Sequence, residues 1–435
     1  MPPRCSPFLL SLAVAATAAA QVPLAEVAKI ARERAERSRP AQQAALEPFW
    51  GDLKLDYRIN QQHIDQKVAE VAALGDSVVP LLLEKLQPAQ GGEDARHLAG
   101  NCRRVLERLD PASFVDALVE LVNGSNDVGR NEAIRLLGVA HTPQATAVLV
   151  DQLDRTTGED KRLVVRSLRL QKAAIAAPKV VTMLASSDRQ VREDVLAYLV
   201  AARAGQVADT VIQALATEKD NKLLPWYVQY FAAAVKAHDA AARALLPLLD
   251  RDRLDYVETR QLAQALATIA PPEHEPTVRR LHQIIDDGET SSLAVTAAVS
   301  LRALGDRQGV TKLKRSLDEQ VRKPSRRRES SLYELRANLL FAIEEYGEAL
   351  ADFEKALEFS VQDGMAMARR AYVGQMRCEA RRRKIPNLTK LMKQSGFLVA
   401  EIEAIGNDDP VFAETLQQDR VRQFLRDLAK EQQPK

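Results

Sequence analysis

The stretch Glu289–Leu317 has the pattern of a helical hairpin, and this pattern constrains the fold more than any other feature of the chain. Apolar or small residues recur at helical spacing in two runs, which are Leu293, Ala297, Leu301 and Leu304, and then Val310, Leu313 and Leu317. Between the runs, Gly305 suits a left-handed residue just past a helix end, and Asp306 suits the start of the next element. A single hairpin cannot bury its own apolar stripe, so a chain built from such units must stack them.

Similar hairpins recur along the chain from about Arg58, and their starts lie 29–36 residues apart. These starts lie near Glu93, Asn126, Glu159, Asp188, Asp220, Arg253 and Glu289. Acidic or amide residues mark six of these seven positions, Arg253 being the exception, and such residues suit helix capping after a polar turn. Hydrophobic residues make up 46% of the chain and aromatic residues only 5%, a balance that favours closely packed helices over a sandwich or barrel. The sequence therefore predicts an all-α fold, an α-solenoid of stacked antiparallel helix pairs.

Several of these units resemble HEAT repeats. The segment Asp188–Leu196, which reads DRQVREDVL, is similar to the start of such a repeat, with its Asp-x-x-Val-Arg signature. The segments 131–138 and 301–306 resemble the end of the first helix of a repeat. The resemblance covers residues 58–318, and it implies a curved solenoid with the second helix of each pair on the concave face.

Beyond this region the chain resembles the tetratricopeptide repeat family. The matching positions are Tyr333, Ala337, Tyr346, Ala349, Phe353 and Ala356. The run 346–357, YGEALADFEKAL, is similar to the second helix of that family, whereas Arg336 occupies a position that is normally apolar. A second unit spans 365–396, and the tail is similar to the short helical ending that often closes such bacterial arrays. This resemblance implies a second superhelical module.

The polar run 319–330, EQVRKPSRRRES, separates the two kinds of repeat. We expect one continuous superhelix in which Glu289–Leu317 contacts the second module, with a bend at Pro324. A short helix over 42–50, ending before Gly51-Asp52, is expected within the N-terminal cap. The predicted parts are 1–20 as a signal peptide, 21–57 as N-terminal capping helices, 58–318 as HEAT-like repeats, 319–330 as a basic linker, 331–396 as tetratricopeptide-like repeats and 397–435 as C-terminal capping helices.

The N-terminus has the pattern of an export signal. Arg4 precedes an apolar run over 8–16, and Ala18-Ala19-Ala20 then supplies the small residues that a signal peptidase accepts. A buried helix or a membrane anchor is the alternative, but the apolar run is too short to span a bilayer. Cys5 lies before the apolar run, where it could not become a lipid-modified mature N-terminus. We predict a periplasmic or extracellular protein.

No catalytic or metal-binding constellation emerges from the sequence. The histidines are scattered among different units, at positions 63, 97, 141, 238, 274 and 282. His274, Glu275 and His282 come nearest to a metal cluster, but prolines surround them and predict a solvated loop between helices. Cys102 and Cys378 lie on apolar helix faces, which indicates two buried thiols rather than a disulfide. No cofactor, no metal and no enzymatic activity is predicted.

Two basic clusters and one aromatic cluster are candidate binding features. The basic clusters are Arg322–Arg328 and the group Arg377, Arg381, Arg382, Arg383 and Lys384. We interpret both as a solvated linker and helix face, with an acidic partner or an anionic lipid surface as the alternative. The aromatic cluster Trp226, Tyr227, Tyr230 and Phe231 is predicted to pack between repeats, with anchoring of a partner as the alternative.

The sequence favours an exported bacterial scaffold for protein–protein interactions. A formal charge of +2, from 61 basic and 59 acidic residues, gives no general attraction to nucleic acid or anionic membrane. We expect a monomer that binds protein partners and has no transmembrane segment in its mature form. The alternatives are a structural envelope protein that binds cell wall or anionic membrane, and a lyase-like enzyme, since some HEAT-like proteins resemble bilin lyases.

The export signal yields a direct prediction about the mature protein. Cleavage after Ala20 should leave Gln21 as the first residue, because Ala18 and Ala20 have the small side chains that the peptidase site requires. Intact-mass measurement and N-terminal sequencing of protein recovered from the native host test this. A mature exported chain that still begins at Met1 would contradict it.

Overall fold

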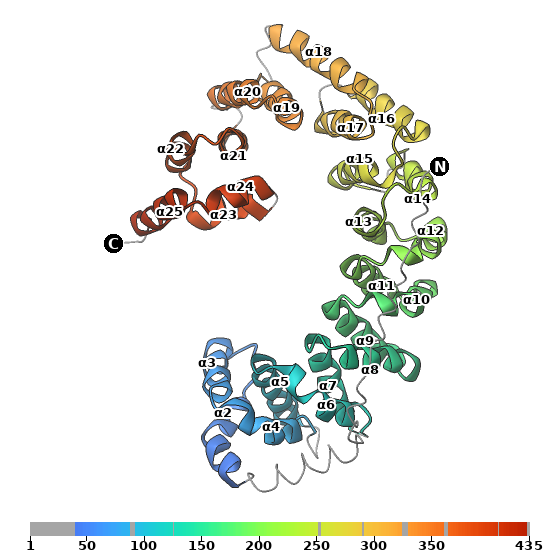
Figure 1. Cartoon of the computed structure of the whole chain (residues 1–435), viewed down its shortest axis with the longest axis vertical. Helices are drawn as coiled ribbons and strands as arrows, with labels where there is room; N and C mark the ends of the chain where they lie inside the picture. The colour runs from blue at the N-terminus through green and yellow to red at the C-terminus, as the bar shows by residue number, and fades with distance from the viewer. Residues whose placement is uncertain are drawn as a thin grey trace, which may run out of the picture. The chain divides into compact units, whose positions relative to one another are not determined.

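The computed structural model shows a chain of helices with no β-strand in the part that it describes (Figure 1). The structure describes residues 40–87, 92–124, 126–250, 254–288, 291–323, 329–360, 364–407 and 409–432. The expected signal peptide, 1–20, and residues 21–39 of the expected N-terminal capping helices lie outside these residues. None of the helices within these ranges is long and apolar enough to cross a membrane.

The chain divides into two compact units, Met1–Ala173 and Ala174–Lys435. The division falls inside 58–318, the range for which the sequence predicts one series of repeats. In unit 1 the helices are 40–46, η1 (Glu47–Phe49), α2 (Trp50–Leu53), α3 (Gln61–Ala72), η2 (Gly75–Val78), α4 (Val79–Lys85), α5 (Glu93–Arg108), η3 (Pro111–Phe114), α6 (Val115–Val122), α7 (Asp127–Val139), α8 (Pro143–Arg155) and α9 (Gly158–Gln171).

Unit 1 is a stack of antiparallel helix pairs. The first helices α3, α5, α7 and α9 pack on one another in order, and α6 packs on α8 beside them. Their contact faces are aliphatic, and Val68, Val105, Leu137 and Val165 are among the side chains buried between helices. The predicted helix break at Gly51-Asp52 is wrong, because both residues lie inside α2, which ends at Leu53.

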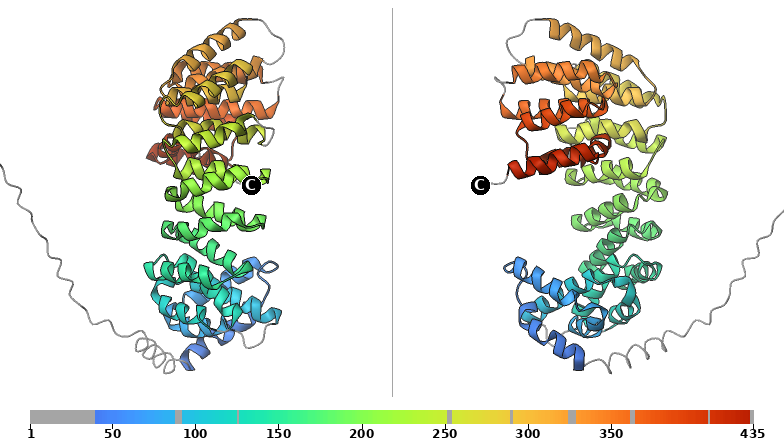
Figure 2. Two further views of the ribbon diagram at one scale, coloured as in Figure 1. Left: turned by 90° about the vertical axis from the view of Figure 1, so that its right-hand side faces the viewer. Right: turned by 60° about the vertical axis from the view of Figure 1, so that its left-hand side comes forward.

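Unit 2 begins with two layers of helices. One layer holds α11 (Arg189–Ala202), α13 (Leu224–Ala234), α15 (Tyr256–Ile269) and α17 (Ser292–Ala303). The other holds η4 (Ala174–Ala176), α10 (Ala177–Val180), η5 (Val181–Ala185), η6 (Gly205–Val207), α12 (Ala208–Thr217), α14 (Asp239–Leu245), η8 (Leu246–Asp250), α16 (Glu275–Asp287) and α18 (Gln308–Arg322). The short helix η7 (Asn221–Leu223) leads into α13. Figure 1 shows the two layers side by side, and in both views of Figure 2 the helices of this part lie one above another.

The C-terminal part of unit 2 continues with α19 (Glu329–Ala342), α20 (Tyr346–Phe359), α21 (Met365–Arg381), α22 (Ile385–Ser395), α23 (Val399–Asn407), α24 (Pro410–Leu416) and α25 (Asp419–Glu431). Successive helices from α19 to α22 pack antiparallel on one another, and α25 packs on α22. A buried cluster with Met392, Phe412 and Val421 closes the end of this series. The predicted fold class, an all-α solenoid built from helix pairs, is thus confirmed.

Helix caps are present at three of the seven expected unit starts, and two others, Arg253 and Glu289, lie outside the described residues. Asn126, Asp188 and Asp220 each accept a backbone N–H bond that caps the next helix. Glu93 and Glu159 are not caps, contrary to expectation, because each lies inside the first turn. A carboxylate is still favourable there, since the helix N-terminus carries a partial positive charge.

The hairpin α17–α18 has the turn that its sequence predicts. Gly305 has a φ of 97°, a left-handed value that glycine adopts without strain. The N–H of Gly305 donates to the carbonyl of Arg302, and the N–H of Asp306 donates to the carbonyl of Leu301. The Asp306 carboxylate accepts from the N–H of Gln308 and so begins α18. α18 extends to Arg322, so residues 319–322 are helical, and residues 324–328 lie outside the described part.

The expected contact between α17–α18 and the helices that follow is present. Arg336 of α19 donates two hydrogen bonds to Asp352 of α20, at 2.6 and 2.7 Å, and one to Asp318 of α18, at 3.0 Å. Arg302 of α17 also donates to the carbonyl of Ala342 at 3.0 Å. The side chain of Asp352 is only 7% exposed, so Arg336 is the counter-charge that its burial requires. This ion pair explains why an arginine stands at a position where the repeat pattern has an apolar residue.

Two glycines of unit 1, one in α5 and one in α7, allow a matched test of how closely its helices pack. A Cβ on Gly138 of α7 would lie 2.9 Å from Cβ and 3.0 Å from Cα of Ser167 in α9, whereas a Cβ on Gly100 of α5 would meet nothing within 4 Å. Gly138→Ala should therefore destabilise the stack by about 1–3 kcal/mol through overpacking. Gly100→Ala should stabilise it by about 1 kcal/mol, since alanine is the better helix former.

Denaturant unfolding with hydrogen exchange read at α5, α7 and α9 measures both changes. Equal effects of the two substitutions, in sign and size, would contradict the close approach of α7 and α9.

Candidate functional site

A groove with a volume of about 400 Å³ lies within unit 2. Its lining comes from α15, α19, α20, α21 and α23, so it collects residues from distant parts of the sequence. The lining side chains are Arg260, Glu334, Asn338, Phe341, Phe353, Arg369, Arg370, Val373, Arg377, Phe397, Glu401 and Ile405, with Gly374 between them. We call this set the arginine groove.

The face of α21 that lines the groove follows from helical spacing. Arg370, Val373, Gly374 and Arg377 are separated by three or four residues, so they lie along one side of the helix. Gly374 has no side chain, and a Cβ there would lie 2.4 Å from Cε1 of Phe353. The ring of Phe353 can therefore press against the α21 backbone and form the apolar floor of the groove.

Arg369 and Arg370 each contact an acidic residue of the groove. The Arg370 guanidinium donates to Glu334 at 2.8 and 3.3 Å, and Arg369 donates to Glu401 at 2.5 Å. Arg369 also lies over the ring of Phe397, with its guanidinium carbon 4.3 Å from the ring centre. The side chains of Arg369 and Glu401 are 45% and 40% exposed, so that ion pair is open to solvent, whereas Arg370 is 55% exposed and its partner Glu334 only 16%.

Arg377 is held by a more buried carboxylate. Nε of Arg377 donates to Asp409 at 2.7 Å, and Nη2 of Arg381 donates to the same carboxylate at 2.9 Å. Asp409 is 1% exposed in its side chain and also accepts from the N–H groups of Val411 and Phe412, which caps α24. Burial alone would raise the pKa of Asp409, but the Arg377 guanidinium, the Phe412 N–H and Arg381 together hold that pKa below its ordinary value.

Arg260 is the fourth cation of the groove and comes from α15, far from the others in sequence. Its side chain is exposed, and it forms no ion pair with any residue in the described ranges. The groove therefore contains four guanidinium groups and two carboxylates, Glu334 and Glu401, among its lining residues. Of the described residues, no serine, threonine, cysteine, histidine or lysine that could act as a nucleophile or base belongs to this lining. The chemistry it offers is binding of an anionic group beside an apolar one.

A larger hollow of about 820 Å³ lies between α23, α24 and α25. Its lining includes Leu425, Ala429 and Gly406 with acidic and basic residues interspersed. It contains two arginines, Arg422 and Arg426, and two carboxylates, Glu403 and Asp419, which leave no excess charge, and it draws only on the last three helices of the chain. The arginine groove is therefore the stronger candidate site.

The candidates from the sequence fall mostly outside the groove. Only Arg377 of the basic group 377–384 lines it, and the run Arg322–Arg328 is largely outside the described residues. The prediction of a solvated basic face holds for Arg382, Arg383 and Lys384, which are exposed. It is wrong for Arg377 and Arg381, which are partly buried and bind the buried carboxylate of Asp409.

The histidine candidates do not form a metal site. His274 is buried rather than solvated, which corrects the prediction, and its Nδ1 lies 2.8 Å from Oγ1 of Thr277 at the start of α16. His282 contacts Asp306 instead. No group of three potential metal-ligating side chains converges anywhere in the described ranges.

The cysteine prediction is confirmed, and the aromatic prediction is confirmed for three of its four residues, since Trp226 is only partly buried. Tyr227, Tyr230 and Phe231 are fully buried, and the hydroxyl of Tyr230 donates to the carbonyl of Ala204 at 2.9 Å. Cys102 and Cys378 are buried free thiols. Burial raises the pKa of Cys378 to about 12, and it also raises the pKa of Cys102, so neither is a reactive thiolate near neutral pH.

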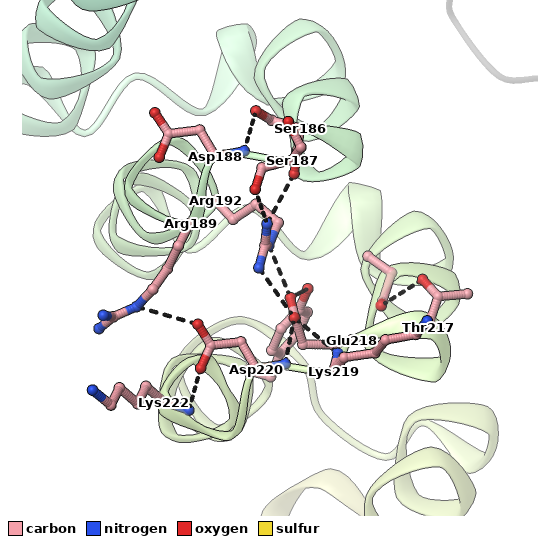
Figure 3. A network of polar contacts seen from close by, with 12 residues as sticks. Ser186, Ser187, Asp188, Arg189, Arg192, Thr217, Glu218, Lys219, Asp220 and Lys222 are labelled. Carbon is pink, nitrogen blue, oxygen red and sulfur yellow. Dashed lines mark hydrogen bonds and ion pairs between the residues drawn. The ribbon is translucent and has the colours of Figure 1, made fainter.

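A second polar network surrounds Arg192, near the start of α11 (Figure 3). Arg192 of α11 donates to the carbonyls of Ser186 and Ser187 at 2.9 and 3.1 Å, and to Glu218 at 3.1 Å. Glu218 in turn accepts from the N–H of Asp220 at 2.9 Å. Because the side chain of Glu218 is 5% exposed, these bonds connect successive helix pairs and leave little of the network open to a ligand.

Comparison with known proteins adds little to this site. No protein-family model matches the chain, and no curated protein matches it. Solved structures do match, among them the crystal structure of an engineered protein that is 18% identical in sequence, with a TM-score of 0.38. That alignment covers 80% of this chain and 98% of the engineered one. The fold stated above rests on the observed helices and their packing.

The lowered pKa of Asp409 predicts a pH-dependent contribution to stability. Asp409→Asn should cost about 1.5–3 kcal/mol near pH 7, because it removes the charge that Arg377 and Arg381 bind. The folded pKa lies below the ordinary 3.8, so the contribution is complete above pH 3.8 and is lost as pH falls through the folded value.

The difference in the free energy of unfolding between wild type and Asp409→Asn should therefore become smaller from pH 7 to pH 3. Denaturant unfolding, with hydrogen exchange read at α21 and α24, measures this difference. Asp419→Asn, at an exposed position that begins α25, is the control and should change stability by at most about 0.5 kcal/mol. A difference for Asp409→Asn that stays constant with pH would contradict the assignment.

Proposed function

We propose that the chain is an exported bacterial scaffold that binds a protein partner through the arginine groove. In this proposal HEAT-like helix pairs lead into a tetratricopeptide-like module, whose first helices α19, α21 and α23 present the groove. The observation that carries the proposal is the convergence of four arginines and a phenylalanine-lined floor from five helices. Stacked helix pairs supply such a surface without a loop, and an extended or helical partner segment can lie in it.

Binding is favoured over catalysis by the composition of the groove. A catalytic site needs a nucleophile or a general base within reach of the substrate, usually oriented by a third group. The groove offers guanidinium groups, which stay protonated, aromatic rings, and two carboxylates, Glu334 and Glu401, that Arg370 and Arg369 already bind. Arginine and aromatic side chains are the residue types that carry most of the energy at protein interfaces.

Export supports the same proposal. A protein outside the cytoplasm meets few nucleic acids, and the pattern at 1–20 is typical of exported chains. The cysteines in the described part are buried within the fold, so the chain does not depend on disulfides to be stable outside the cell.

Site-specific photocrosslinking in the native host tests the proposal. A photoreactive residue at Asn338, an exposed position of α19 in the groove, should give a discrete adduct with a partner protein. The same residue at Glu354, an exposed position of α20 outside the groove, is the control and should give none. Equal labelling at both positions, or no adduct at Asn338, would contradict groove-mediated binding.

A further inference from the structure

We infer that the arginine groove selects an acidic peptide segment with an apolar anchor, and that Glu334 and Glu401 are internal competitors for its arginines. In the free protein these two carboxylates occupy Arg370 and Arg369, and a carboxylate of the partner replaces them on binding. This inference rests on the proposed function and specifies the chemistry of its partner.

The charge of the groove identifies the sign of the ligand. Four arginines and two glutamates line it, which leaves an excess of two positive charges. Arg260 has no counter-ion among the described residues, and Arg377 uses only its Nε on Asp409, so both offer donors to a ligand. Carboxylates match the fork geometry of guanidinium groups, and they gain a charge-assisted pair of hydrogen bonds.

The two kinds of ion pair in the groove differ in how readily they exchange. The carboxylate of Asp409 is 1% exposed, caps α24 and is bound by two arginines, so its removal disrupts the fold. Arg369 and Arg370 are about half exposed, as is Glu401 at 40%, so the Arg369–Glu401 pair contributes little to stability. A carboxylate from a partner can therefore replace Glu401 at low cost, whereas Glu334, whose side chain is 16% exposed, is more costly to replace.

The apolar floor identifies the second requirement. Phe341, Val373 and Ile405 are partly exposed beside the arginines, and Phe353 closes the floor beneath them. An apolar side chain of the partner that reaches this floor loses contact with water, while a neighbouring acidic residue reaches the guanidinium groups. Alternation of acidic and apolar residues in an extended segment satisfies both requirements.

Nucleic acid and membrane fit the same groove less well. Single-stranded nucleic acid needs open aromatic faces for base stacking. Here Arg369 lies over Phe397, and Arg377 lies over Phe341 at 4.9 Å from the ring centre, so both rings already have a guanidinium partner. A lipid surface is broad, whereas these charges line a hollow of about 400 Å³ between helices.

A random peptide library of about twelve residues, selected on the immobilised full chain, tests the inference. Selected peptides should be enriched in Asp and Glu next to Leu, Ile or Phe. Their affinity, measured by fluorescence anisotropy, should fall about fivefold or more for Arg260→Gln, because that change removes an unpaired cation. Arg420→Gln, at an exposed position of α25 outside the groove, removes the same charge from the same unit and should leave affinity unchanged.

The competitor role of Glu334 and Glu401 makes the sharper prediction, because it requires that their substitution increase the affinity for the peptide. Glu334→Gln and Glu401→Gln should each tighten binding of the selected acidic peptide by about threefold or more, since Arg370 and Arg369 become free. The amide oxygen introduced by Glu401→Gln can still accept the N–H of Leu398 that the Glu401 carboxylate accepts, so the start of α23 is kept. Glu403→Gln, at an exposed position of α23 outside the groove, is the control and should have no effect.

Weaker or unchanged binding by both glutamate variants would overturn the competitor role. Selection of basic or neutral peptides, or of none, would overturn the acidic specificity. Tighter binding of an oligothymidine or of phosphatidylglycerol vesicles than of any selected peptide, lost in Arg260→Gln, would replace the peptide with that ligand. If Asn338 still crosslinks a protein in any of these cases, the proposed scaffold function stands and only the acidic-peptide inference fails.

Discussion

Burial of one helix face by the next helix pair is the interaction on which both units depend. The first helix of each pair keeps a stripe of apolar or small residues on this face. In α17, for example, Ala294, Ala297, Ala298 and Leu301 are fully buried. Burial of a side chain such as leucine contributes roughly 1.5–3 kcal/mol, and each helix of the stack repeats that contribution. Small residues matter as much as large ones, because alanine and glycine let neighbouring helices approach closely. The regular spacing of the layers follows from this requirement.

Polar joints supplement the apolar stripes where successive pairs meet. The Arg192 network bonds the loop before α11 to Glu218 after α12, and Arg336 joins α18, α19 and α20 through Asp318 and Asp352. Each joint buries a carboxylate that would be costly alone, and an arginine with several donors satisfies it. Such joints are specific in a way that alanine stripes are not, because they fix which loop meets which helix. They are a reason why helix pairs of differing sequence still pack in order.

The helices were predictable from the sequence because periodicity is local. Apolar spacing located α17 and α18, and Gly305 marked the turn between them, as the structure confirms. Helix starts were harder, since Glu93 and Glu159 occupy first turns where the pattern indicated caps. Burial of His274 was missed because the nearby prolines predicted a solvated loop, whereas they precede and begin α16.

The arginine groove was not predictable, because its residues are brought together only by packing between helices that are far apart in sequence. Arg260 lies more than a hundred residues before Arg369, and no local pattern connects them. The one available signal was Gly374, a glycine inside an otherwise regular helix, which indicates close approach of another group. The exposure of the partner carboxylate then distinguishes arginines that stabilise the fold from arginines that are free to bind a ligand. Arg336 and Arg381 each face a carboxylate that is at most 7% exposed, whereas Arg260 faces none among the described residues, and only structure reveals that difference.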